Sequence, residues 1–152
     1  MTLEFISFLL PLQLEMVGVM KQANYRVEQD TGLCEVSRVV FAWTTSNKGM
    51  GVCLDNINHY SKQKGYDRRA IGKIVNQAIT HEAVHVAQMC NKGKTVLSDR
   101  VQLDELSPKQ KSGVVRSMAY SLNLGSAALE AEAYYMEKSP TLTTYLLKRY
   151  CL

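Results

Sequence analysis

The chain has 152 residues, of which 46% are hydrophobic, so it is long enough for one globular domain that buries about two-thirds of its unfolded surface and too short for two. Its net charge of +4 comes from scattered basic pairs, not from a concentrated stripe, which argues against a nucleic-acid partner. There is no internal repeat, low-complexity tract or Pro/Gly/Ser linker, so residues 1–152 are expected to form a single domain.

The first twenty residues are strongly apolar, which raises the question of a signal peptide or a membrane anchor. However, no positive charge precedes the apolar run, Glu4 and Glu15 interrupt it, and no small-residue cleavage site follows. Apolar residues recur at helical spacing from a start near Pro11 to an end near residues 30–32. The pattern predicts a core helix, and no stable membrane insertion is expected. The predicted buried stripe consists of Leu12, Met16, Val19 and Ala23.

Two stretches that follow are rich in β-branched and aromatic residues. Residues 35–45 and 51–57 have the composition of strands, and the Ser-Asn-Lys-Gly segment between them has the composition of a turn. We therefore expect a small antiparallel β-hairpin.

The most informative segment is residues 81–85, which read HEAVH within a predicted helix that starts at the N-cap Asp67 and ends before residues 91–93. Positions i and i+4 share one helix face, so two imidazoles can reach one metal ion, and Glu82 then points toward a water on that ion. Burying three polar groups in an otherwise uncharged segment is costly unless a ligand satisfies them. The pattern predicts a zinc site with His81 and His85 as ligands. The competing interpretation is a pair of ordinary histidines without metal.

Three further helices are expected after Gly93, at about residues 108–123, 126–137 and 140–150. The first and the last open with a serine followed by proline, the usual pairing of an N-cap with the first helical position. The predicted fold is therefore α+β and mostly helical, with a small hairpin or sheet beside the HEAVH helix.

Residues 78–87 (AITHEAVHVA) resemble the active-site helix of the zincin superfamily of metallopeptidases, in which HExxH lies in an uncharged, apolar frame. The resemblance covers about ten residues strongly and a later helix weakly. It implies a zincin-like fold, in which the strand before the active-site helix forms the rim of the substrate cleft. The metzincin extension is excluded, because Gln88 and Asn91 stand where a glycine and a third histidine would be needed. The chain resembles a small gluzincin.

In gluzincins the third zinc ligand is a glutamate from a second helix, and residues 126–136 resemble that helix. Glu130 has smaller neighbours than Glu132 on the helical projection, and small side chains let two helices approach closely. We expect Glu130 to be the ligand. Glu132 is the alternative, either as a ligand or as an acceptor for a histidine N–H. Weaker candidates are Asp104, Glu105 and Glu137.

The implied activity is that of a zinc-dependent peptidase. Zn²⁺ activates a water molecule, and Glu82 acts as the general base that takes its proton and returns it to the leaving amine. The implied partner is a peptide or protein substrate. The alternative is a non-catalytic binding or structural protein on a zincin-like scaffold. The remaining histidine, His59, is expected in a surface loop. Sources of a further oxyanion donor are Tyr120, Tyr134 and Tyr135, although simple packing would explain each of them.

The four cysteines contain no close pair, which argues against a Cys-any-any-Cys site. Bridges Cys34–Cys53 and Cys90–Cys151 would bracket the predicted hairpin and join the end of the HEAVH helix to the C-terminal residues. This is one of three pairings. Each bridge could contribute about 2–4 kcal/mol, and both would indicate an oxidising or extracytoplasmic compartment. The alternative is four buried thiols in cytosol.

Overall fold

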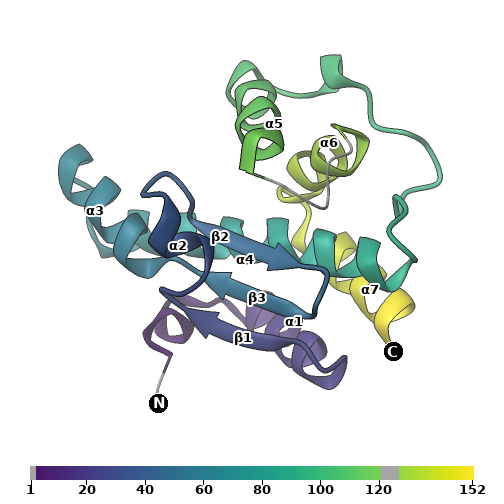
Figure 1. The fold of residues 1–152 in the computed structure, drawn as a ribbon, viewed down its shortest axis with the longest axis horizontal. Coiled ribbons are helices and arrows are strands. Elements are labelled where there is room, and N and C mark those ends of the chain that lie inside the picture. The colour runs from purple at the N-terminus through teal and green to yellow at the C-terminus, as the bar shows by residue number, and fades with distance from the viewer. Residues whose placement is uncertain (1–2, 121–126) are drawn as a thin grey trace.

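The computed structural model describes residues 3–120 and 127–152, and it has the predicted α+β class. Helices surround a small sheet, and the longest helix crosses the middle of the molecule behind it (Figure 1). In chain order the elements are η1 (Glu4–Phe8), α1 (Pro11–Gln22), β1 (Arg26–Gln29), α2 (Leu33–Val36), β2 (Ala42–Thr45), β3 (Gly49–Val52), α3 (Leu54–Lys64), α4 (Arg68–Cys90), η2 (Leu103–Glu105), α5 (Pro108–Tyr120), α6 (Ala127–Met136) and α7 (Pro140–Cys151).

The sheet has three strands in the order β1-β3-β2. β2 and β3 form the predicted antiparallel hairpin, whereas β1 pairs in parallel with β3 on its other side. The N–H of Cys53 donates to the carbonyl of Phe41 over 2.8 Å, which makes these two residues a hydrogen-bonded pair. Because such pairs alternate along an antiparallel ladder, the backbone groups of Ala42 and Thr44 point to the free edge of β2.

The first predicted helix was too long. α1 ends at Gln22, Asn24 adopts a positive φ of 66°, and β1 follows at once. The parallel pairing of β1 with β3 overrides any continuation of the helical pattern. Of the predicted stripe, Met16 and Val19 are buried, and Leu12 and Ala23 are half-buried, so the helix does pack into the core.

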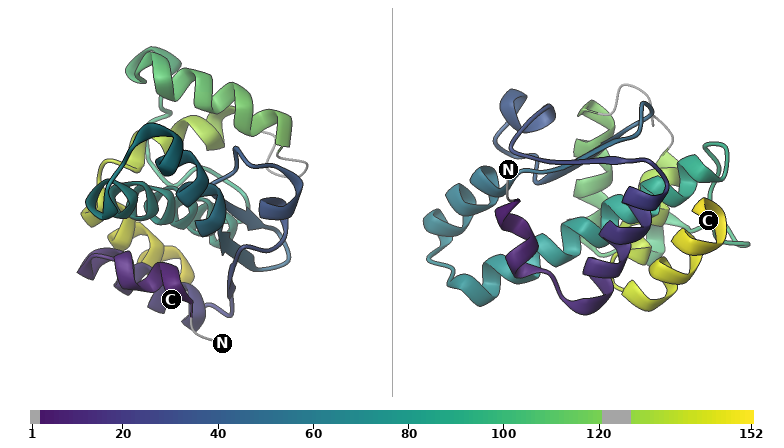
Figure 2. Two further views of the ribbon diagram at one scale, coloured as in Figure 1. Left: turned by 90° about the vertical axis from the view of Figure 1, so that its left-hand side faces the viewer. Right: turned by 90° about the horizontal axis from the view of Figure 1, so that it is seen from below.

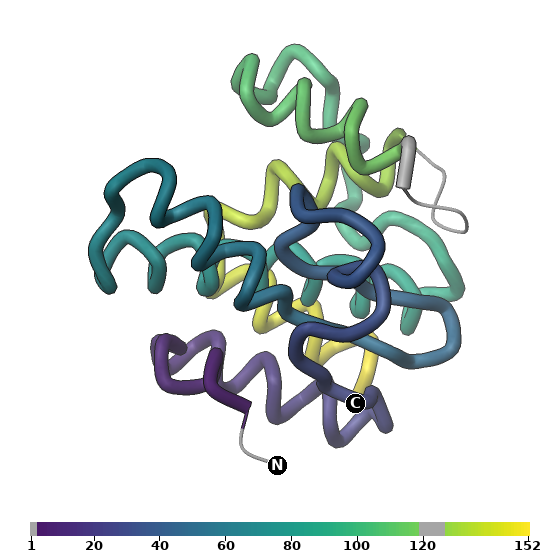
Figure 3. Tube along the Cα trace, turned by 60° about the vertical axis from the view of Figure 1, so that its left-hand side comes forward, coloured from purple at the N-terminus to yellow at the C-terminus, as the bar shows by residue number. Residues whose placement is uncertain are grey.

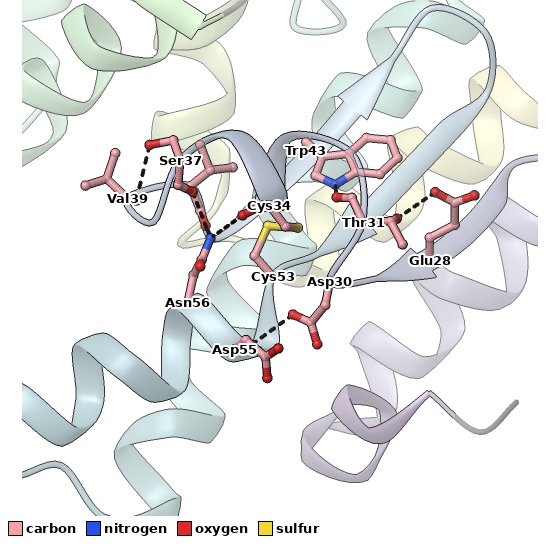
Figure 4. The surroundings of a disulfide bond; sticks show 11 residues. Glu28, Asp30, Thr31, Cys34, Ser37, Val39, Trp43, Cys53, Asp55 and Asn56 are labelled. Carbon is pink, nitrogen blue, oxygen red and sulfur yellow. Dashed lines mark hydrogen bonds between the residues drawn. A yellow bond between two sulfur atoms is a disulfide. The ribbon is translucent and has the colours of Figure 1, made fainter.

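Both predicted strands were also too long. The side-chain amide of Asn56 donates to the carbonyls of Cys34, Ser37 and Val40 over 2.8–3.3 Å, so the segment before β2 wraps around this side chain instead of extending (Figure 4). A short helix, α2, lies in this segment. The second strand ends at Val52, because Cys53 is the N-cap of α3.

α4 follows its prediction closely. The carboxylate of Asp67 accepts the N–H of Ala70 over 2.9 Å, so the predicted N-cap is confirmed. The helix stops at Cys90, and Lys92 and Gly93 then take positive φ values. From Ile79 to Gln88 every residue of α4 is buried, because the sheet and four other helices pack around it.

The C-terminal helices lie on two sides of α4. α6 packs directly against α4, and α5 packs on α6 over a small second core (Figures 2 and 3). α7 packs along α4 and α1. The predicted bounds agree with α5, α6 and α7 where the chain is described, and the predicted ends at residues 121–123 and 126 lie outside the described residues.

Both predicted disulfides, Cys34–Cys53 and Cys90–Cys151, are formed. The first fastens α2 to the start of α3, and the second fastens the end of α4 to the end of α7. Such bridges persist in oxidising compartments, which is therefore the environment that they indicate. Among the described helices, none combines the length and the apolar character required to cross a membrane.

Candidate metal centre

Three side chains that can bind a metal converge between α4 and α6. His81 and His85 lie one turn apart on α4, and Glu130 faces them from α6. Glu130 Oε1 lies 3.1 Å from His85 Nε2, and Oε2 lies 3.5 Å from His81 Nε2. One ligand atom from each residue lies within 4.8 Å of the other two. The structure thus brings together the three residues that the sequence indicated as ligands.

The three side chains are close enough together to share one small cation. Bonds of about 2.0–2.2 Å in tetrahedral geometry place two ligand atoms about 3.3–3.6 Å apart, and each carboxylate oxygen of Glu130 lies near this distance from one histidine. The burial of Glu130 supports the same interpretation. Its side chain is only 5% exposed, and Oε2 has no hydrogen-bond partner among the described residues. A buried carboxylate oxygen without a donor is costly, and a cation would satisfy it.

His81 is held by a second carboxylate. Its Nδ1 lies 3.0 Å from Oε2 of Glu137, which directly follows α6. Glu137 is held in turn by the side-chain amides of Gln77, at 2.7 Å, and Gln110, at 3.4 Å. A carboxylate accepts hydrogen bonds, so His81 donates from Nδ1 and turns Nε2 toward Glu130. Glu137, a weaker ligand candidate in the sequence, is a partner of a ligand instead.

His85 is held by a neutral group. Its Nδ1 lies 2.8 Å from Oε1 of Gln88, three residues further along α4. Glu132, the alternative third ligand, accepts N–H groups from Gln88, Val96 and Leu97. It is not among the three converging side chains, and its described hydrogen bonds include neither histidine. Its carboxylate is engaged by the segment that follows α4.

The charges of the cluster shift the pKa values of its members. Burial alone would lower the pKa of His81, but the nearby carboxylates of Glu130 and Glu137 raise it well above its ordinary value of 6.5. Burial also acts to lower the pKa of His85, and the charge of Glu130 reverses that effect. Burial would raise the pKa of Glu130, but His85 and His81 hold it far below its ordinary value. Without metal, the cluster therefore holds protons that a cation would displace.

Glu82 follows His81 on α4, but its carboxylate contacts strand β2 and not the other members of the cluster. Its Oε2 accepts the hydroxyl of Thr44 from the edge strand β2 over 2.6 Å. Its side chain is buried, with 7% exposed. The carboxylate thus remains outside the group of three and contacts β2, the outer strand of the described sheet.

The other residues named from the sequence lie outside the group of three. The ring of Tyr134 packs edge-on against His81 with centroids 4.4 Å apart, and its hydroxyl lies 3.2 Å from that of Ser117. Tyr135 is exposed, and the side chain of Tyr120 lies outside the described part. His59 is exposed as predicted, but on α3 instead of in a loop. Asp104 and Glu105 lie in η2, away from the cluster.

Sequence reasoning missed the contacts of Thr44 with Glu82 and of Gln88 with His85. It named Glu137 only as a weaker ligand candidate and missed its contact with His81. Gln88 could have been found, because it stands at i+3 from His85 on the same helix face. Thr44 and Glu137 carry no comparable local signal, since their positions depend on how β2 and α6 pack against α4.

The fold and the site define a small α+β protein with a buried His-His-Glu group, in which both histidines come from the central helix α4 and the glutamate comes from α6. Residues 5–152 match a family described as a domain of unknown function (DUF8637), and the chain belongs to this family. No curated protein and no solved structure matches the chain.

Proposed function

We propose that this protein is a zinc-dependent peptidase in which His81, His85 and Glu130 hold the metal. The observation that carries the proposal is the convergence of these three buried side chains, with Glu82 left outside the group. Two neutral imidazoles and one carboxylate are a ligand set found in catalytic zinc sites, where a fourth position stays open. A structural site would more often use cysteines, and all four cysteines are in disulfides.

Bound zinc would supply a Lewis acid that lowers the pKa of a coordinated water and polarises the substrate carbonyl. Glu82 provides the base: its carboxylate accepts the proton of the attacking water and returns it to the leaving amine. Thr44 orients Glu82 by donating its hydroxyl to Oε2. His81 and His85 keep both Nε2 atoms directed at the metal position, because Glu137 and Gln88 occupy their Nδ1 atoms.

The edge of β2 offers a place for the substrate backbone. The outward N–H and C=O groups of Ala42 and Thr44 can pair with an extended peptide as an added strand. Thr44 also contacts Glu82, so a peptide bound along this edge would pass beside the base. The zincin resemblance assigns such a role to a strand that precedes the active-site helix.

The test begins with the metal content of protein purified without chelators. The proposal expects about one zinc per chain, retained in Glu82→Gln and lost in His81→Ala. Hydrolysis of a peptide library, followed by mass spectrometry, should disappear in Glu82→Gln and persist in Glu35→Gln, an exposed control on α2. Wild-type protein without stoichiometric metal would overturn the zinc assignment. Unchanged turnover in Glu82→Gln would overturn the role of the base.

A second candidate is a non-catalytic binding or structural protein with a metal in the same site. The burial of the site favours it, because His81, Glu82 and Glu130 are all buried residues. Stoichiometric zinc together with no cleavage of any library peptide would select this candidate. A loss of folding on removal of the metal would further assign the metal a structural role.

We also infer an extracytoplasmic location from the two disulfides. Protein isolated from its native source and denatured under alkylating conditions should show no free thiol. Four free thiols would place the protein in a reducing compartment.

A further inference from the structure

A buried chain of hydrogen bonds leads from the segment after α4 to His85. The carboxylate of Glu132 accepts the N–H of Val96 at Oε1 over 2.8 Å and the N–H of Leu97 at Oε2 over 3.1 Å. Oε1 also accepts the side-chain amide of Gln88 over 3.0 Å. The side-chain oxygen of Gln88, Oε1, lies 2.8 Å from Nδ1 of His85. Glu132 is 1% exposed and Gln88 is fully buried, so water does not compete for these bonds.

The partners of Gln88 leave its amide only one orientation. Its Nε2 faces the carbonyl oxygen of Leu129 and the carboxylate of Glu132, each at 3.0 Å, and both of these groups can only accept. If the amide were turned over, its oxygen would face these two acceptors. The carbonyl of Leu129 and the carboxylate of Glu132 would then lose the donor that Gln88 provides. The NH₂ group therefore faces α6, and the oxygen faces His85.

This orientation determines the tautomer of His85. The oxygen of Gln88 accepts, so Nδ1 of His85 must carry the proton. Nε2 is then the nitrogen that is left to bind a metal. Without metal, the carboxylate of Glu130 lies 3.1 Å from this atom and competes for a proton on it. We propose that Gln88, oriented by Glu132 and Leu129, is a positioning residue that fixes His85 in the tautomer with Nε2 free for the metal. The consequence for zinc rests on the proposed function, whereas the tautomer does not.

The two ligand histidines are therefore fixed by different chemistry. Glu137 holds His81 with a charge and is supported by two glutamines from α4 and α5. Gln88 holds His85 with a neutral amide and is supported by a charge further away. An amide in this position adds no charge to the metal centre. Whether its oxygen or its NH₂ group faces His85 depends on Glu132, which holds the NH₂ group on the other side.

The tautomer can be measured once the competing carboxylate is removed. The metal-free Glu130→Ala variant is labelled with ¹⁵N, and the imidazole shifts of His85 are recorded at a pH above which they no longer change. The proposal expects the Nδ1–H tautomer, with Nε2 at the shift of an unprotonated nitrogen. A predominant Nε2–H tautomer would overturn it.

Zinc affinity gives the second readout. Gln88→Met has nearly the same length but neither donates nor accepts, so His85 should lose its preference for Nδ1–H and zinc should bind about 10- to 100-fold more weakly. The matched control is Gln13→Met: Gln13 is a buried glutamine of α1 that donates to Thr80 and contacts neither histidine. Its affinity should stay within about twofold of wild type. Equal zinc affinity and an unchanged tautomer in Gln88→Met would overturn the proposal.

Failure of the proposed function would give a different result. If the wild-type protein binds no zinc, the peptidase assignment fails, while the tautomer in Glu130→Ala still decides the role of Gln88. If the wild type binds zinc and Gln88→Met binds it equally well, the peptidase assignment stands and the role of Gln88 fails. Should Gln88→Met not fold, the tautomer in Glu130→Ala alone decides.

Discussion

The carboxylate of Glu137 lies 3.0 Å from Nδ1 of His81, and this contact turns the other nitrogen of the ring toward Glu130. Glu137→Gln removes the charge and keeps the size of the side chain. Because a carboxylate partner raises the basicity of a ligand histidine, we expect zinc to bind about tenfold more weakly. Competition with a chelating dye measures this change. Glu35→Gln is the exposed control, and equal affinity in both variants would contradict the role of Glu137.

The raised histidine pKa values predict how pH acts on the metal-free protein. His81 and His85 titrate higher in the folded chain than at their ordinary value of 6.5. The stability that they contribute is therefore fully present below pH 6.5 and is lost as pH rises through the folded pKa values. Zinc must displace the same protons, so the rise in Tm on adding zinc should grow over this range.

Thermal unfolding with and without zinc, between about pH 6 and 9, measures both effects. His59→Ala is the matched control, because His59 is exposed on α3 and bonds only to Gln63 among the described residues. It should leave both pH dependences unchanged, whereas His85→Ala should flatten them. A zinc-induced rise in Tm that shrinks with increasing pH would contradict the prediction.

Thr44 should matter for turnover and not for metal content. Thr44→Val keeps the shape of the side chain but removes the 2.6 Å hydrogen bond to Glu82. Hydrogen bonds to charged groups contribute about 1.5–3 kcal/mol, so loss of the oriented base should lower kcat about tenfold or more. Thr44→Ser retains the hydroxyl and should restore most of the rate. The assay uses a library peptide that the wild type cleaves, and zinc content should be equal in all three proteins.

Gly113 allows α5 to lie close to Tyr134. A Cβ at Gly113 would come within 2.5 Å of the tyrosine ring. Gly113→Ala should therefore destabilise the protein by about 1–3 kcal/mol through overpacking, despite the better helix propensity of alanine. Gly18→Ala is the matched control in α1, where nothing lies within 4 Å of the added carbon, and it should be neutral or stabilising by up to about 1 kcal/mol. Urea unfolding measures both. Equal effects of the two substitutions would contradict the close packing of Tyr134.

The parts of the fold that sequence predicted well have strong local signals. α4 has an aspartate N-cap and a glycine after its end, and α5 and α7 begin with serine and proline. β1 has only four residues, and its pairing with β3 comes from a segment more than twenty residues away. No local pattern marks such a strand, and the helical periodicity before it extends past Asn24.

In the candidate site, too, residues with a local sequence signal could be predicted and residues that meet only in the fold could not. His81, Glu82 and His85 could be found because they lie within one turn and a half of one helix. Glu130 could be preferred over Glu132 from the size of its neighbours on α6. The partners of the ligands come from a strand, a helix end and a loop that meet only in the folded chain, so Thr44, Glu137 and Val96 could not be placed beforehand.

The Cys90–Cys151 bridge spans most of the C-terminal half of the chain. A single backbone cut anywhere between these two cysteines leaves both pieces covalently joined. If this protein cleaves its own copies in that region, the product would migrate as intact chain on a non-reducing gel and separate into two bands only after reduction. Self-cleavage of a proposed peptidase should therefore be examined on reduced samples.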